Sequence, residues 1–331
     1  MNSILQFELH NFGPERIRDI DESLRAGRAL PPDWYTDRVV FEAERVAVLR
    51  RSWHYAAHAD ELKKAGDQII QKVGGVPIVL LRNEQNEIRG FVNICRHRAH
   101  PVVLENQNQR SMQCLYHGWT YGLDGCLRAA PRSRTDPSFD ERIFPLMAIQ
   151  VHQWGPTLWV NLDLNAPNFS DWAEGLPALV AKQGITMDRY RFSSEKTRTI
   201  KANWKVFIDN ADESYGRALH RHWIFPTTFL RYDSDLGGYD FSAIRALEVD
   251  RTELKTVSLV RSDMSKHAED LRHNSRDDEP FVEDELIVCE RAQAAHAAGL
   301  SEQLPPRSQR LLLHLREALL GLAKKKPHEK M

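Results

Sequence analysis

The sequence predicts an α+β protein in which a small β-rich domain precedes a mixed domain of strands and helices. Short apolar runs separated by polar turns extend from about residue 68 to about residue 163, a pattern typical of strands and hairpins. Within this stretch, Asp124-Gly125 is a strong signal for a tight turn between two strands. Beyond it, strand and helix patterns alternate, and the last part of the chain has helical periodicity.

The elements follow in order. Residues 30–62 contain a helical run, DRVVFEAERVAVLRRSW. The strands of the first domain are expected at QIIQKV, VPIVLLR, IRGFVNI and TLWVNLD. In the second domain, WAEGLPALVAKQ predicts a helix, RFSSEKTRTIKANW a strand, residues 203–222 a helix, and IRALEVDRTELKTVSLVRS two strands. Residues 262–282 are polar and predict a loop. The tail helix RLLLHLREALLGL places four leucines on one face, namely Leu311, Leu315, Leu319 and Leu322.

Composition excludes several classes of function. The 331 residues suffice for two domains, and a net charge of −1 gives no overall field for nucleic acid or an anionic membrane. No stretch approaches the roughly 18 apolar residues that span a bilayer. The first residues, MNSILQFELHNF, lack a basic region followed by an apolar run. We therefore expect a cytoplasmic protein, in which cysteines near histidines indicate metal or catalysis more often than disulfides.

Two of the four cysteines have a histidine close by in the sequence. Cys95-Arg96-His97 and Cys114-Leu115-Tyr116-His117 each offer one thiolate and one imidazole at the tip of a predicted β-loop, whereas Cys126 and Cys289 are read as free thiols. Two Cys and two His could hold a tetrahedral zinc ion or a [2Fe–2S] cluster. A zinc ribbon or finger usually pairs like ligands within a short loop. Here each loop instead combines one Cys with one His, as expected if each loop binds both irons of a cluster. The spacing therefore favours the [2Fe–2S] cluster over zinc.

The residues around these ligands extend the pattern. The segments NICRHRAHP and CLYHGWTYGLDG, with LPPDWYTDRVVFEAERVAVLRRSWHYAAHADEL before them and WGPTLWVNLD after them, resemble the Rieske non-haem iron oxygenases over nearly the whole chain. The resemblance implies a Rieske [2Fe–2S] β-domain followed by an α+β helix-grip domain of the Bet v 1 and START type. The expected division is an N-terminal extension at 1–45, the Rieske domain at 46–162 and a catalytic-type domain at 163–331, with region 223–282 shortened.

The resemblance also implies a role for each ligand. Cys95 and Cys114 would bind the inner iron as thiolates, and His97 and His117 would bind the outer iron near the surface. Neutral imidazoles in place of thiolates raise the reduction potential above that of all-Cys clusters. Leu115 stands where the family usually has proline, which should shift a turn without removing a ligand.

The family also holds a mononuclear Fe(II) with two His and one carboxylate. The family motif begins with N-W-K, which is followed by an acidic residue next to an Asn and then by a second acidic residue. The first His ligand comes three positions after that second acidic residue, and the second His ligand comes five positions after the first. Here Asn203-Trp204-Lys205, Asp209-Asn210 and Glu213 match, but Gly216 and Arg221 occupy the two histidine positions. The available histidines are His220 and His222, one step to either side of Arg221, so we expect Fe(II) to be bound weakly or not at all.

Further site residues are carried over from the same resemblance. Asp284 in EDELIVCERAQ matches the third iron ligand, with Asp277 and Asp278 as weaker candidates. Glu213 matches the carboxylate that links a cluster histidine of one subunit to an iron histidine of the next, and Asn210 is assigned to the catalytic set. Because a first-turn helix acid or a helix-surface acid is common, a purely structural role for Asp284 and Glu213 stays open.

Two functions therefore remain open. The first is an oxygenase component that hydroxylates a small organic substrate, or removes a methyl group from an amine by oxidation, with O₂. No G-x-G-x-x-G run follows a strand, so a separate NAD(P)H-dependent reductase of the flavin or ferredoxin type would supply electrons. The second is a non-catalytic homologue that keeps the cluster beside an intact subunit. The resemblance implies a homo- or hetero-trimer or hexamer in either case.

Overall fold

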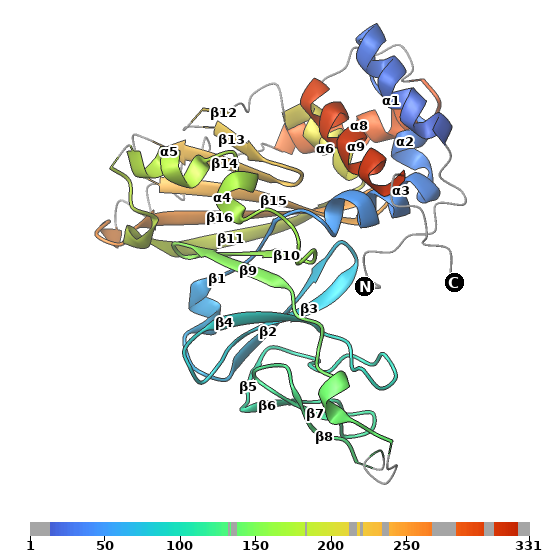
Figure 1. Ribbon diagram of the computed structural model, residues 1–331. Helices are drawn as coiled ribbons and strands as arrows, with labels where there is room; N and C mark the ends of the chain where they lie inside the picture. Colours follow the sequence, from blue (N-terminus) through green and yellow to red (C-terminus); the bar gives the residue numbers. More distant parts are fainter. Residues whose placement is uncertain are drawn as a thin grey trace. The chain divides into compact units, whose positions relative to one another are not determined.

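The computed structural model (Figure 1) describes residues 14–131, 133, 138–182, 184–211, 217–218, 221–233, 238–266, 283–300 and 308–323. The chain divides into two compact units. The first in sequence, the inserted unit, comprises Trp53–Ala166. The second, the split unit, combines Met1–Ser52 with Pro167–Met331. The segment 1–45 was expected to be an N-terminal extension; its described part, from residue 14, belongs to the same unit as the C-terminal part of the chain.

The inserted unit consists of short antiparallel sheets. One sheet has the order β1-β10-β9, a second β4-β3-β2-β5 and a third β6-β7-β8. The bounds are β1 His54–His58, η4 Ala59–Leu62, β2 Asp67–Val73, β3 Val76–Arg82, β4 Ile88–Val92, β5 Gln107–Asn108, β6 Ser111–Gln113, β7 Thr120–Gly122, β8 Leu127–Ala129, η6 Glu141–Ile143, β9 Gln150–Trp154 and β10 Thr157–Asn161. The predicted strand-rich domain is confirmed.

The tight turn between β7 and β8 requires a glycine at position 125. Gly125 has a φ of +82°, a conformation that other residues rarely adopt, and an added Cβ would lie 2.3 Å from the ring of Phe91. The Gly125 N–H donates to the carbonyl of Gly122 at 2.9 Å. The tight turn predicted from Asp124-Gly125 is therefore present, and it lets the third sheet pack close to β4.

The split unit is built on one antiparallel sheet of six strands in the described residues, with the order β11-β16-β15-β14-β13-β12. Its strands are β11 Tyr190–Ile200, β12 Arg217–Ala218, β13 Arg221–Ile224, β14 Thr228–Asp233, β15 Gly238–Glu248 and β16 Arg251–Arg261. Its helices are α1 Pro14–Ala26, α2 Asp33–Thr36, α3 Arg38–Glu44, η3 Arg45–Leu49, α4 Phe169–Trp172, α5 Leu176–Lys182, η7 Met187–Arg189, α6 Trp204–Ala211, α8 Glu283–Ala297 and α9 Gln309–Ala323.

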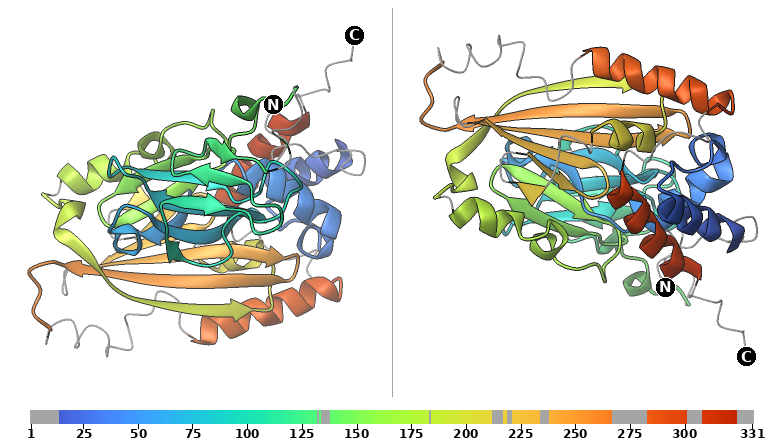
Figure 2. Two further views of the ribbon diagram at one scale, coloured as in Figure 1. Left: turned by 90° about the horizontal axis from the view of Figure 1, so that it is seen from below. Right: turned by 90° about the horizontal axis from the view of Figure 1, so that it is seen from above.

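One face of this sheet packs against helices. Trp223 of β13 and Phe229 of β14 share a buried cluster with Phe207 of α6 and with Leu311 and Leu315 of α9. Helices from both ends of the chain meet here, because α9 lies beside α1 (Figure 2), with an ion pair between Arg316 and Asp21. The α+β class and the sheet covered by helices agree with the helix-grip expectation.

The predicted helix over residues 203–222 is only half correct. Helix α6 ends at Ala211, and residues 221–224 form β13, in which Trp223 pairs with Phe229 of β14. The strand is favoured because it completes a backbone ladder and buries Trp223 to 1% exposure, which local helical periodicity does not reveal. The predicted loop at 262–282 lies largely outside the described residues. The tail helix is confirmed, with Leu311, Leu315 and Leu319 buried.

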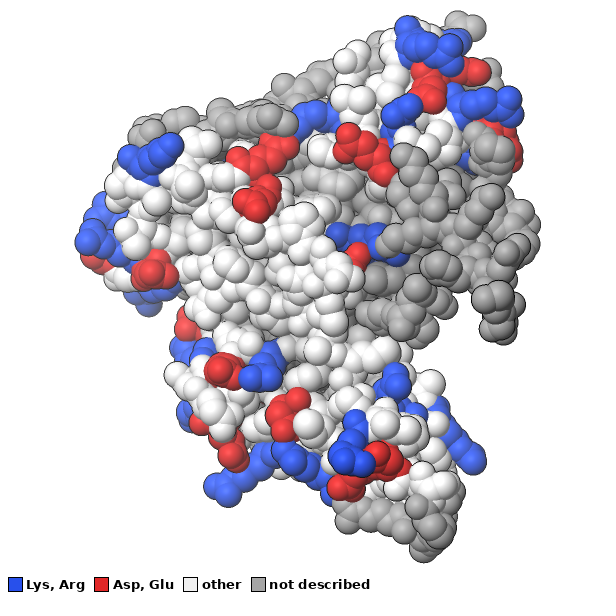
Figure 3. Space-filling view, in the orientation of Figure 1, with Lys and Arg blue, Asp and Glu red and all other residues white. Residues whose placement is uncertain are grey.

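The described surface carries no dominant charge. Basic and acidic side chains are interspersed over the face shown in Figure 3, as the net charge of −1 suggests. No helix among the described residues is long and apolar enough to cross a membrane.

Candidate metal centres

The four predicted cluster ligands lie on two loops of the inserted unit. The first loop follows β4, where the Cys95 N–H donates to the carbonyl of His100 at 2.8 Å and the Ala99 N–H donates to the Cys95 carbonyl at 3.1 Å. The second joins β6 to β7, where the Cys114 N–H donates to the Trp119 carbonyl at 2.8 Å. Hydrogen bonds between backbone groups thus fix each cysteine at the base of its loop.

The cysteines are buried and the histidines are more accessible. Cys95 and Cys114 are 3% and 2% exposed, whereas His97 and His117 are half-buried. The two imidazole rings meet edge to face, with centroids 4.7 Å apart and an angle of 71° between their planes. The buried Nδ1 of His117 has no hydrogen-bond partner among the described residues, so this nitrogen can ligate a metal. The thiols therefore form an inner pair and the imidazoles an outer pair.

Trp119 fixes the outer pair. Its indole stacks on His97 with ring centroids 4.9 Å apart and an 8° angle between the planes. Phe139 and Phe144 contact the indole edge-on at 5.6 and 5.5 Å. This apolar support limits rotation of the imidazole and keeps water from one of its faces.

Tyr121 and His100 contact the sulfur atoms. The Tyr121 hydroxyl lies 3.4 Å from the Sγ of Cys95 and accepts the N–H of Arg96 at 3.0 Å. The Nδ1 of His100 lies 3.9 Å from the Sγ of Cys114. The sequence did not single out Trp119 or Tyr121, and it left His100 as either a surface residue or a residue that supports the cluster ligands from behind. Their position within a few residues of the ligands was the available signal.

The electrostatics suit ligation by neutral imidazoles and buried sulfur. Burial lowers the pKa of His97, and the nearby His117 and Arg98 lower it further, so the ring is neutral and can donate a lone pair. Burial also raises the pKa of the Cys114 thiol, and the adjacent Cys95 sulfur adds to that rise. Such closely placed sulfurs become thiolates together only when positive charge stabilises them, as bound iron does.

The arrangement also bears on the choice between zinc and a cluster. The candidate ligands form a buried sulfur pair and a more accessible nitrogen pair, which matches two irons joined in one cluster. A model of the Rieske [2Fe–2S] domain matches residues 52–146. The chain carries a Rieske domain. The cofactor of this domain is a [2Fe–2S] cluster, as the ligand pattern predicted.

Known proteins extend the comparison beyond the Rieske domain. The oxygenase subunit of carnitine monooxygenase from Escherichia coli K12 is 32% identical over 187 residues, which are 56% of this chain and 50% of that protein. A chloroplastic choline monooxygenase from Atriplex hortensis is 27% identical over 230 residues, which are 67% of this chain and 52% of that protein. The chain thus spans about half the length of the curated relatives it matches.

A solved structure supports the fold of both units. The apo form of the quaternary ammonium Rieske monooxygenase CntA superposes with a TM-score of 0.74 at 21% identity, covering 92% of this chain and 98% of that one. Together with the domain match, these comparisons show that the chain is similar to Rieske monooxygenases in the sequence of its Rieske domain and in the fold of both units. The expected order of a Rieske β-domain followed by an α+β domain is confirmed.

The predicted mononuclear iron site is only partly described by the structure. Glu213, Gly216 and His220 lie outside the described residues, as do Asp277 and Asp278. Asp284 belongs to the first turn of α8, but its side chain also lies outside the described part. The ligand set of this iron therefore stays a prediction.

His222 is described, and it points away from α6. Neighbouring side chains on a strand face opposite sides of the sheet. Because Trp223 packs on the face covered by α6, His222 lies on the other face, opposite Leu230. It is 1% exposed there. The structure therefore does not bring His222 together with the helix that leads to Glu213.

Asn210 lies in the last turn of α6, close to α8. Its amide donates to the Val206 carbonyl at 2.7 Å and lies 3.6 Å from the Sγ of Cys289. The adjacent Asp209 accepts a hydrogen bond of 2.8 Å from the hydroxyl of Tyr35 in α2. The last described turn before Glu213 is therefore held by side chains from two other helices.

Proposed function

We propose that the chain is the oxygenase component of a Rieske-type system. It would carry out O₂-dependent hydroxylation or oxidative N-demethylation of a small organic substrate. The observation that carries the proposal is the paired Cys95, Cys114, His97 and His117 set within a fold shared with Rieske monooxygenases. When bound, the [2Fe–2S] cluster accepts and releases one electron at a time.

The residues of this chain prepare the cluster site for that task. Cys95 and Cys114, which are buried, would hold one iron, and His97 and His117, which are more accessible, would hold the other. Trp119 stacks on His97 and keeps its ring in place. A separate NAD(P)H-dependent reductase and an oligomer, with three or six subunits, belong to the same proposal.

Gly216 supports a second candidate function. A glycine offers no donor at the first iron-histidine position, so this chain could retain the cluster while an intact subunit performs the oxygen chemistry. The two candidates differ in one measurable property, which is substrate-dependent O₂ consumption by the isolated chain.

The cluster is tested by replacing one thiol. Purified protein should show the visible absorption and the reduced-state EPR spectrum of a Rieske centre, and Cys114→Ser should abolish both. Cys126→Ser is the matched control, because Cys126 is an exposed thiol in the same unit. A colourless protein that holds only zinc would contradict the proposal.

A further inference from the structure

The first ligand loop, residues 94–101, is closed at its base by the side chain of Asn93. The amide oxygen of Asn93 accepts the N–H groups of Val102 at 3.0 Å and Val103 at 2.9 Å. Its amide nitrogen donates to the Val103 carbonyl at 2.7 Å. The side chain of Asn93 thus bonds to Val103 through one donor and one acceptor, as the backbone of a neighbouring strand would. We call these three hydrogen bonds the Asn93 clamp.

The clamp is tied to the sheet and to the core of the inserted unit. Asn93 is 3% exposed, and its backbone N–H donates to the carbonyl of Pro77 in β3 at 2.9 Å. Val102 and Val103 belong to the buried cluster that also contains both cluster cysteines. The clamp therefore fixes the base of the first ligand loop on rigid elements of the same core that holds the second ligand loop.

The tip of the first ligand loop carries a strained backbone. Ala99 has a φ of +56°, in the left-handed region, where the Cβ of an alanine lies too close to the following carbonyl oxygen. The residue is exposed, so burial of its methyl group does not offset this cost. Its N–H donates to the Cys95 carbonyl at 3.1 Å. A strained conformation persists only where the surrounding structure imposes it.

His97 lies between the clamp and the strained tip, four residues after Asn93 and two before Ala99. Its ring stacks on Trp119 and meets His117, and both contacts depend on the course of the loop. If Ala99 relaxed to the right-handed region, the chain would leave His97 in another direction and the imidazole would move. A metal ligand has to be held within about 0.5 Å of its productive position.

We propose that Asn93 is a positioning residue for the [2Fe–2S] cluster. Its clamp holds Ala99 in the left-handed conformation and thereby keeps His97 in the geometry of an iron ligand. Asn93 acts through the backbone of the loop, and His97 is the group that binds iron. The inference rests on the cluster in the proposed function and holds for both candidate functions, because both retain the cluster.

The test removes the clamp from the cluster-loaded protein at nearly constant side-chain size. Asn93→Leu deletes all three hydrogen bonds, and bleaching of the Rieske absorption by an iron chelator measures the release of iron. This release should accelerate at least roughly tenfold, since one ordinary hydrogen bond alone is worth a factor of five. Pulsed EPR of the reduced cluster resolves the nitrogen couplings of the two histidine ligands. One of the two should broaden or disappear, which general destabilisation would not cause.

Ala99→Gly provides the rescue. Glycine adopts the left-handed conformation readily, so this change removes the strain that the clamp offsets. Added to Asn93→Leu, it should slow iron release about fivefold, the equivalent of the roughly 1 kcal/mol that the conformation costs an alanine. It should also restore the altered nitrogen coupling.

Ala99→Val tests the strain with the clamp intact. A β-branched residue tolerates the left-handed conformation less than alanine does, so iron release should accelerate. This variant decides the matter if Asn93→Leu does not accumulate as folded protein. Faster release would then support the proposal, and an unchanged rate would refute it.

Asn83→Leu is the matched control. Asn83 is also 3% exposed, and its side chain accepts the Glu87 N–H at 2.8 Å and donates to the Glu87 carboxylate at 3.0 Å. This turn also contains a left-handed residue, Asn86 with a φ of +65°, but it carries no predicted cluster ligand. Asn83→Leu should leave iron release and both nitrogen couplings at their original values.

The outcomes distinguish this inference from the proposed function. An unmodified protein without a Rieske EPR signal would overturn both. With the signal present, three results would overturn the inference alone. They are unchanged iron release and couplings in Asn93→Leu, equal effects of Asn83→Leu, and no recovery when Ala99→Gly is added to Asn93→Leu.

Discussion

Single side chains around the cluster loops contact the cysteine sulfur atoms, and we expect them to tune the reduction potential of the cluster. The Tyr121 hydroxyl lies beside the sulfur of Cys95, and His100 lies beside the sulfur of Cys114. A hydrogen bond to a ligating thiolate withdraws electron density and favours the reduced cluster. Both contacts come from residues that the ligand pattern does not include.

Tyr121→Phe should lower the reduction potential of the cluster. The loss of one hydrogen bond of about 1 kcal/mol corresponds to roughly 40 mV for a one-electron couple. Redox titration followed by EPR measures the change. Tyr116→Phe is the control, since Tyr116 is exposed and its ring contact with His117 survives. Equal potentials in the wild type and Tyr121→Phe would show that the hydroxyl does not tune the cluster.

Gly216 leads to a second prediction at this scale. Gly216→His alone should restore little Fe(II) binding, because the second family position still holds Arg221. Gly216→His combined with Arg221→His should raise iron uptake by more than the sum of the two single changes, since ligands of one metal act as a unit. Anaerobic metal analysis after desalting measures this. Additive gains would mean that another side chain completes the site.

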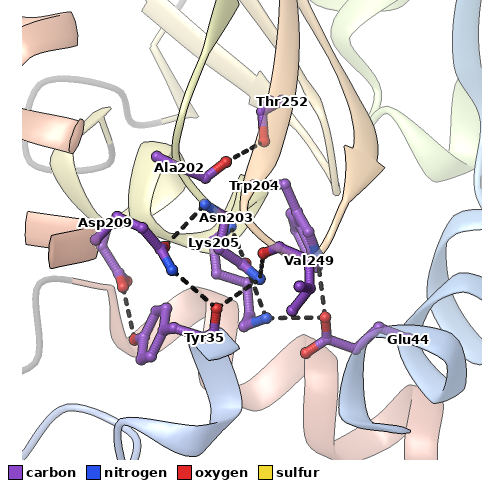
Figure 4. A network of polar contacts seen from close by, with 10 residues as sticks. Tyr35, Glu44, Ala202, Asn203, Trp204, Lys205, Asp209, Val249 and Thr252 are labelled. Atoms are coloured by element: carbon purple, nitrogen blue, oxygen red, sulfur yellow. Dashed lines mark hydrogen bonds and ion pairs between the residues drawn. The ribbon is translucent and has the colours of Figure 1, made fainter. Parts of the chain in front are cut away.

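Helix α6 is the element that links local sequence to the second site. Its Asn203-Trp204-Lys205 start supplies a cap, an indole and a cation, and all three contact partners distant in sequence. The ion pair that Lys205 makes with Glu44 (Figure 4) is fully desolvated, so its contribution to the free energy of unfolding depends on both partners being present. Replacing one partner should therefore destabilise the protein more than replacing both.

Lys205→Met should destabilise the protein by about 3–5 kcal/mol, because Glu44 is left buried without its cation and must either stay charged in the interior or take up a proton. Adding Glu44→Leu should recover a large part of that loss. Chemical denaturation gives the free energies, and the difference between the double variant and the sum of the singles gives the coupling. Lys255→Met serves as the control, since its pair with Glu195 is partly exposed and worth about 0–1 kcal/mol. A double variant no more stable than Lys205→Met would contradict the account.

The limits of sequence reasoning also appear at the level of elements. The cluster ligands and the Asp124-Gly125 turn were predictable because their chemistry lies within a few residues. Residues 221 and 222 were misassigned to a helix, because the strand β13 that they begin depends on pairing with β14. The partners of Lys205 were equally unpredictable, since Glu44 is 161 residues away in the sequence. Contacts between residues so far apart in the sequence leave no pattern in the local sequence.

At the scale of the whole molecule, the two units divide the predicted metal-binding motifs between them. All four predicted cluster ligands belong to the inserted unit, whereas α6 and α8, which lead to the predicted mononuclear motif, belong to the split unit. Each unit has its own buried core, with Val79, Phe91 and Trp119 in one and Phe207 and Trp223 in the other. Substitutions in the cluster loops should therefore leave α6 and α8 folded, and substitutions in α6 or α8 should leave the cluster assembled.

The cluster should accordingly assemble whether or not the second iron is bound. The unmodified chain should contain about two irons after desalting under anaerobic conditions, the content of one [2Fe–2S] cluster, together with a full Rieske EPR signal. Cys114→Ser should remove these irons without unfolding α6. Three tightly held irons, with substrate-dependent O₂ consumption by the chain alone, would show that the mononuclear site is complete in spite of Gly216.

The insertion of one unit within the other has a consequence for synthesis on the ribosome. Trp34 and Val40 are fully buried in the finished protein, but they share their buried cluster with residues of α6 and α9, which are made after the whole inserted unit. At ordinary translation rates that delay is on the order of ten seconds. During this time the Rieske unit can fold and take up its iron, while the first helices wait with apolar side chains in water. A chaperone that recognises nascent apolar segments should therefore bind the N-terminal helices before it binds any part of the Rieske unit.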